Sequence, residues 1–147
     1  MNDAVRDLYQ AIIVEHGRSP RCRGPLPSAT HEASVDNPLC GDRVTLRLLV
    51  ADGAIRSAAY EAQGCTLSLA AASLLATRLG GASLADARAL VDRFAAFVRE
   101  PPDTPVPDAA SLGDLAAFAG VREFKSRQSC ATLAAEAFRR AVAGLRG

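Results

Sequence analysis

Cysteine thiols are the side chains of this sequence that are best suited to chemistry. The 147-residue chain has four, at positions 22, 40, 65 and 130. In a secreted protein they could form two disulfides, whereas in a cytoplasmic chain they point to metal binding or redox chemistry. Cys40-Gly41-Asp42 is a compact pair of ligand-type residues. The glycine lets the backbone turn tightly enough for the thiol and the carboxylate to face one point.

Three of the thiols and one carboxylate could form a shared site. Cys40, Cys65, Cys130 and Asp42 would supply the four donors of a tetrahedral zinc site, and this mainly sulfur set also suits an iron–sulfur cluster. The spacing is long and lacks the paired C-x-x-C of a zinc ribbon. From the residue types alone, zinc, an iron–sulfur cluster and buried structural cysteines all remain open.

A β-hairpin is the element expected to bring these residues together. Apolar residues alternate with other residues from Val44 to Val50, and a second extended run covers residues 54–63 after the turn dipeptide Asp52-Gly53. Because a hairpin returns the chain to its starting point, Cys65 is expected to approach Cys40 and Asp42.

Two helices should carry the other two thiols. Strong helix formers follow Gly64-Cys65 and continue to Gly80-Gly81, and an apolar stripe at helical spacing runs from Cys130 to Leu145. We expect both cysteines in the first turn of a helix, where free N–H groups and the helix dipole favour the thiolate.

The remaining elements are expected to frame this site. The periodicity predicts a first helix that ends near His16-Gly17, then a traversing loop to Pro38 with a short strand around residues 31–35. Ser83 and Asp86 have the spacing of a helix capping box. Four of the eight residues from Glu100 to Pro107 are proline, which indicates a stiff surface linker far from any chemistry.

The composition excludes several functional classes. Lys and Arg total 17 against 16 for Asp and Glu, a balance that argues against a nucleic-acid partner. The longest Ala/Leu-rich stretch, residues 69–76, is far shorter than the roughly 20 residues needed to cross a bilayer. The N-terminus does not resemble a secretory signal, so we expect a cytoplasmic protein with no membrane partner.

The sequence resembles the IscU/SufU/NifU-type iron–sulfur cluster assembly family. The resemblance rests on Asp36-Asn37-Pro38-Leu39-Cys40-Gly41-Asp42, on the Gly64-Cys65 turn with its Ser- and Ala-rich helix, and on Cys130-Ala131-Thr132-Leu133-Ala134. Leu8-Tyr9, residues 18–21 and residues 81–84 are also similar to the family, so the match covers nearly the whole chain in order.

The resemblance implies a fold and a ligand set. The fold is α+β, with a small, mostly antiparallel three-stranded sheet and helices packed on one face. We expect one domain over residues 1–147, with an inserted helix and proline-rich linker at about 84–118. Carried over residue by residue, the family's metal ligands are Cys40, Asp42, Cys65 and Cys130.

Within the family, the sequence is most similar to SufU. The 65-residue interval from Cys65 to Cys130 contains the segment that looks like the SufU insertion. IscU-type proteins have a histidine and SufU-type proteins usually a basic residue immediately before the last cysteine, whereas this chain has Ser129. Arg127 matches an arginine common in the SufU group. Its guanidinium could hydrogen-bond Asp42 or steady a passing persulfide, and an ordinary surface arginine is the alternative.

The resemblance gives two functional hypotheses. In the first, the protein is a zinc-dependent sulfur acceptor that takes persulfide sulfur from a pyridoxal-phosphate cysteine desulfurase similar to SufS and passes it to downstream iron–sulfur assembly proteins. Cys40 is then the attacking thiolate, because Gly41 makes its loop mobile. In the second, the same residues bind iron or a nascent [2Fe–2S] cluster for transfer to recipient proteins. A structural zinc domain that only binds a partner is a third possibility.

Five other residues receive no role in the chemistry. Cys22 is expected to be incidentally exposed, and His16 and His31 to be surface or loop residues. Ser68 and Ser73 are expected to face helix neighbours in packing, because no base in the sequence neighbourhood would activate them.

Overall fold

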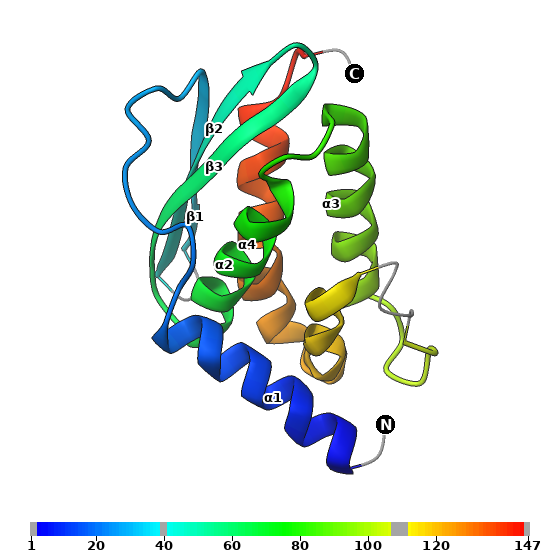
Figure 1. Cartoon of the computed structure of the whole chain (residues 1–147). Helices are drawn as coiled ribbons and strands as arrows, with labels where there is room; N and C mark the ends of the chain where they lie inside the picture. The colour runs from blue at the N-terminus through cyan, green and yellow to red at the C-terminus, as the bar shows by residue number, and fades with distance from the viewer. Residues whose placement is uncertain (1–2, 39–40, 107–111, 146–147) are drawn as a thin grey trace.

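A three-stranded antiparallel sheet with helices on one face forms the fold (Figure 1). The computed structural model describes residues 3–38, 41–106 and 112–145. The strands are β1 (His31–Asn37), β2 (Asp42–Ala51) and β3 (Ala54–Gln63), in the order β1-β2-β3. The α+β class and the three-stranded sheet that the sequence predicts are therefore confirmed, and β1 is longer than expected.

The hairpin forms where the sequence predicts it. Asp52 and Gly53 both have positive φ, 53° and 72°, as a tight turn that follows the right-handed twist of the strands requires. In β2 the side chains at 42, 44, 46 and 48 are buried, and those between them are more exposed. The buried face carries Val44, Leu46 and Leu48 into the core and Asp42 into its edge.

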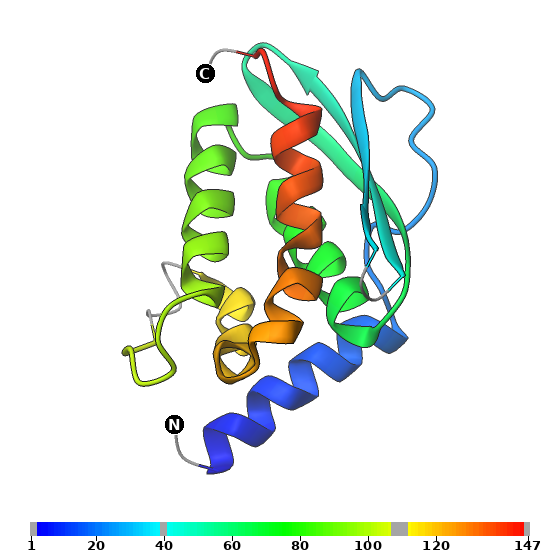
Figure 2. The same cartoon turned by 180° about the vertical axis from the view of Figure 1, so that it is seen from behind.

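Helices cover this buried face in two layers. α2 (Thr66–Leu79) packs on β3, and α4 (Lys125–Ala141) packs on β1 and β2. α3 (Leu84–Val98) packs on α4, on the side away from the sheet, as the view from behind shows (Figure 2). α1 (Asp3–Arg18) crosses the ends of these elements and contacts α2 and η1 (Gly113–Glu123), a 3₁₀ helix. No helix in the described ranges is long and apolar enough to cross a membrane.

Small residues allow these helices to pack closely on one core. Ala70, Ala71 and Ala72 are fully buried on α2, and the largest fully buried side chains include Tyr60 and four phenylalanines: Phe94, Phe97, Phe118 and Phe138. Ser83 caps α3 by accepting a hydrogen bond from the Asp86 N–H at 3.0 Å, so the N-cap expected at Ser83 is confirmed.

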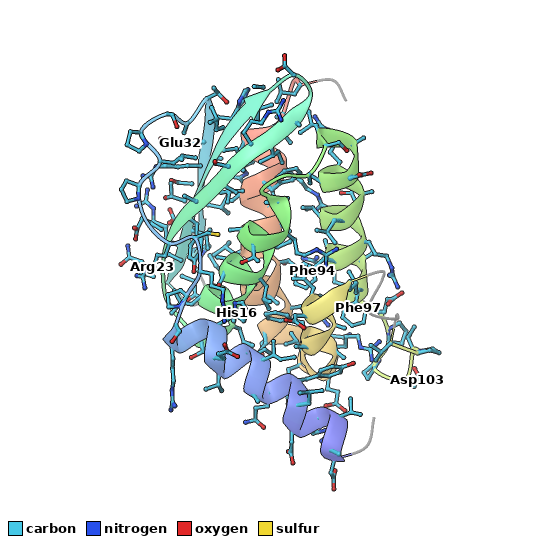
Figure 3. The ribbon with its side chains drawn as sticks, in the orientation of Figure 1. His16, Arg23, Glu32, Phe94, Phe97 and Asp103 are labelled. Carbon is cyan, nitrogen blue, oxygen red and sulfur yellow. The ribbon has the colours of Figure 1, made fainter. Side chains whose placement is uncertain are left out.

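His16 holds the C-terminal end of α1 against α2, so the expectation of a surface or loop residue was wrong. The side chain is 6% exposed, and Figure 3 shows it where α1 meets α2. Its Nδ1 lies 2.7 Å from the Ser73 Oγ, which also accepts a bond from the Arg21 N–H. The Arg21 guanidinium donates to His16 Nε2 and to Glu15. This contact joins residues 57 positions apart, and local sequence patterns do not reveal it.

Acid is expected to weaken this contact. Burial, followed by the positive charge of Arg21, holds the pKa of His16 below its usual value. The unfolded chain therefore binds a proton at a pH where the folded chain does not. Stability is thus lost as the pH falls below about 6.5, by at most about 1.4 kcal/mol per pH unit.

Urea unfolding of the metal-free protein between about pH 7.5 and 5.5 measures this effect. His16→Gln should flatten the pH dependence. His31→Gln, which removes the histidine on β1 that contacts Thr30, is the comparison variant. Equal slopes for the wild type and His16→Gln would refute this assignment.

Candidate metal centre

Three of the four predicted ligands meet at one end of the sheet. Asp42 is the first residue of β2, Cys65 is the N-cap of α2, and Cys130 lies in α4. One ligand atom from each lies within 4.8 Å of the others. The hairpin brings Asp42 close to Cys65, because β2 and β3 pair with Arg43 opposite Gln63. Cys40, the fourth predicted ligand, lies outside the described residues.

The Asp42 carboxylate is the centre of this cluster. Its residue is only 2% exposed. The Cys65 N–H donates to Oδ1 at 3.0 Å, and the Cys65 thiol donates to Oδ2 at 3.2 Å. A carboxylate is stable at such a buried position only when donors surround it. The N-terminal end of α2 supplies one of them as a free backbone N–H.

Gly64 permits the close approach of Asp42 to Cys65. Its φ is +136°, a conformation that L side chains rarely adopt. A Cβ at this position would lie 2.1 Å from the Asp42 Oδ1 and 2.4 Å from its Cγ. Any side chain here would therefore displace the carboxylate or the backbone beside it, so the close approach of Asp42 to Cys65 requires glycine at position 64.

Ser68 belongs to this site, so the expectation that it only packs against helix neighbours was wrong. It is fully buried on the first turns of α2. Its hydroxyl donates to the Asp42 Oδ2 at 2.5 Å and lies 3.2 Å from the Cys130 carbonyl oxygen. Because positions i and i+3 share a helix face, the spacing of Cys65 and Ser68 was the one signal that could have suggested this placement.

Cys130 is placed differently from the sequence-based expectation. α4 begins at Lys125, five residues earlier, so Cys130 lies in its second turn and not its first. The free N–H groups of the helix start are therefore not available to its thiol. Burial begins at this residue, however, as the apolar stripe predicts: Cys130 is 2% exposed, whereas Ser129 before it is exposed.

Arg127 lies at a groove that adjoins the site. It is exposed in the first turn of α4. The groove has a volume of about 700 Å³ and is also lined by Thr66 and Leu67, the two residues that follow Cys65. Phe124, one of the few large apolar side chains that are exposed among the described residues, lines it. The predicted role of Arg127 toward a persulfide stays a prediction.

Cys22 is separate from this described group of ligands. It is exposed, and its backbone pairs with Tyr60 at the edge of β3, where the Tyr60 N–H donates to the Cys22 carbonyl at 3.1 Å. The adjacent Arg23 is labelled in Figure 3, on the loop beside the sheet. The segment thus covers a strand edge.

The donor set fits a metal ion. In a tetrahedral zinc site with Zn–S bonds of about 2.3 Å, neighbouring ligand atoms are about 3.8 Å apart. The described ligand atoms lie within 4.8 Å of one another, which is close to that spacing. Two thiols and a carboxylate suit zinc, and the sulfur atoms also suit an iron–sulfur cluster.

An α+β fold with cysteines and a carboxylate gathered at one end of the sheet defines a class of candidate metal- or cluster-binding proteins. The family model for the NifU-like N-terminal domain matches residues 8–143. The chain therefore belongs to the NifU-like N-terminal domain family, as the sequence motifs indicate.

The individual relatives include both a zinc-dependent sulfurtransferase and an iron–sulfur cluster assembly scaffold. The chain is 31% identical to the zinc-dependent sulfurtransferase SufU of Bacillus subtilis, over 92% of this chain and 90% of SufU. It is 32% identical to the iron–sulfur cluster assembly scaffold protein IscU of Streptococcus pyogenes, over 92% and 82% of the two chains. The crystal structure of the N-terminal part of a nitrogen-fixing NifU-like protein from Brucella abortus superposes with a TM-score of 0.81, at 28% identity over 94% of each chain.

Proposed function

We propose that this chain is an iron–sulfur cluster assembly protein that accepts persulfide sulfur from a pyridoxal-phosphate cysteine desulfurase at a zinc-binding cysteine site. The observation that carries the proposal is the cluster of Asp42, Cys65 and Cys130 at one end of the sheet. The likeness to SufU over nearly the whole of both chains supports the zinc-dependent branch.

The ligands we assign to zinc are Cys40, Asp42, Cys65 and Cys130. Bound zinc keeps thiols deprotonated and protects them from oxidation, because it has no redox chemistry of its own. Cys65 and Cys130 are held by helices and are the fixed ligands. Asp42 is held by hydrogen bonds from α2, and its charge offsets part of the charge of the ion.

Cys40 is the residue that we assign to sulfur transfer. Its thiolate attacks the outer sulfur of the persulfide on the desulfurase cysteine. A new sulfur–sulfur bond forms to Cys40, the bond inside the donor persulfide breaks, and its electron pair leaves on the desulfurase thiolate. The exchange needs no external oxidant or reductant. The next residue, Gly41, has φ +74°, a conformation that glycine adopts without strain.

Arg127 is the residue that we assign to steadying the persulfide. It is exposed at the groove that begins beside Cys65, where its permanent positive charge would attract an anionic persulfide. The groove is lined by residues of α1, by the start of α2 and by the start of α4.

A scaffold that holds a nascent [2Fe–2S] cluster is the second candidate. The sulfur-rich donor set favours it equally on chemical grounds, and the identity to IscU of Streptococcus pyogenes is as high as that to SufU. In this case the cluster is the cargo, and the same four residues bind it.

Sulfide production by a SufS-like desulfurase under reducing conditions separates the two functions. The protein is supplied zinc-loaded, zinc-stripped or not at all. A several-fold rate increase only with the zinc-loaded protein is the expected result. No increase from either form would reject the sulfur acceptor, and anaerobic reconstitution with iron and sulfide would then test the scaffold.

A further inference from the structure

One buried hydroxyl touches every residue of the described ligand cluster. The Ser68 Oγ lies 2.5 Å from the Asp42 Oδ2, 3.2 Å from the Cys130 carbonyl oxygen and 3.8 Å from the Cys65 Sγ. The side chain is fully buried, so water does not compete for these contacts. Ser68 is therefore part of the site without being a ligand.

The single proton of this hydroxyl goes to Asp42. A hydroxyl has one hydrogen to donate, and a bond to a charged carboxylate is shorter and stronger than one to a neutral carbonyl. The distances agree with donation to Asp42, because the Ser68 Oγ lies 2.5 Å from the Asp42 Oδ2 and 3.2 Å from the Cys130 carbonyl oxygen. Because the Cys65 N–H donates to the other carboxylate oxygen, the carboxylate plane is fixed from both sides.

We propose that Ser68 is a positioning residue that holds the Asp42 carboxylate in the orientation that metal binding needs. The inference rests on the metal site of the proposed function. A partner that orients a ligand typically contributes about 10- to 100-fold to metal affinity. Without the hydroxyl, one oxygen of a buried carboxylate loses a donor, and the orientation of the ligand is set only by the α2 backbone and its remaining neighbours.

Zinc affinity, measured by competition with a chromogenic chelator, tests the proposal without an activity assay. Ser68→Ala should weaken zinc binding about tenfold. Alanine is the better helix former, so α2 should persist, and circular dichroism checks this. Ser73→Ala is the matched control: Ser73 is equally buried on the same helix but contacts His16, and its loss should leave zinc affinity unchanged.

A double-mutant cycle separates positioning from packing. In an Asp42→Ala background, Ser68→Ala should have no further effect on zinc affinity, because its partner is gone. Ser68→Thr keeps the hydroxyl and should retain most of the affinity. The inference is overturned by wild-type affinity in Ser68→Ala, by an equal loss in both backgrounds, or by a tenfold loss in Ser68→Thr. If the wild type itself binds no zinc, the proposed metal site falls together with this inference.

Discussion

Gly64→Ala is expected to destroy the metal site. The new Cβ would lie 2.1 Å from the Asp42 Oδ1, so either the carboxylate or the backbone at the start of α2 must move. Both movements break the bond from the Cys65 N–H to Asp42. Backbone strain at this φ adds about 1–3 kcal/mol of destabilisation. We expect zinc affinity to fall by up to about 100-fold, measured by chelator competition.

Gly24→Ala is the matched control for this variant. Gly24 has nearly the same φ, +141°, but a Cβ there would meet no atom within 4 Å. The control should therefore lose stability without losing zinc affinity. Equal zinc affinity in Gly64→Ala and Gly24→Ala would show that the metal site does not depend on the close approach of Asp42 to Gly64.

Cys40→Ala and Cys130→Ala are expected to differ in zinc binding, although both should lose stimulation of the desulfurase. Cys130 is buried among the described ligands, so its replacement should abolish tight zinc binding and, with it, stimulation of the desulfurase. Cys40→Ala should retain part of the zinc, because both helix-held thiols, Cys65 and Cys130, remain together with Asp42. It should lose stimulation completely, since the attacking thiolate is gone. Zinc content and sulfide production of each purified variant are the two measurements.

Cys22→Ala provides the control for thiol removal. Cys22 is exposed and its backbone pairs with the edge of β3, so this variant should match the wild type in zinc content and in stimulation. Normal stimulation by Cys40→Ala would show that another residue receives the sulfur.

The sequence predicted the parts of the site that depend on local structure. The Asp52-Gly53 turn and the alternation in β2 implied the hairpin, and the hairpin brings Asp42 to Cys65. The change from strand to helix formers at Gly64-Cys65 placed Cys65 correctly at the start of α2. These signals are short-range, because turn and helix preferences act over a few residues.

The features that were missed depend on contacts between distant segments. Ser68 reaches Asp42 across 26 residues, and Ser73 reaches His16 across 57. A serine on an alanine-rich helix has no local pattern that distinguishes a packing role from a role in holding a ligand.

The start of α4 was placed too late for a local reason. Residues 125–129 are polar, and the apolar stripe from which the helix was inferred begins only at Cys130.

Mass spectrometry of this protein after incubation with a desulfurase and cysteine shows whether the chain accepts sulfur. The zinc-loaded wild type should gain one sulfur atom as a persulfide, and thiol-blocking followed by proteolysis should place it on the peptide that contains Cys40. Absence of any added sulfur, or its appearance only on the peptide that contains Cys22, would contradict the account of this chain as a sulfur acceptor.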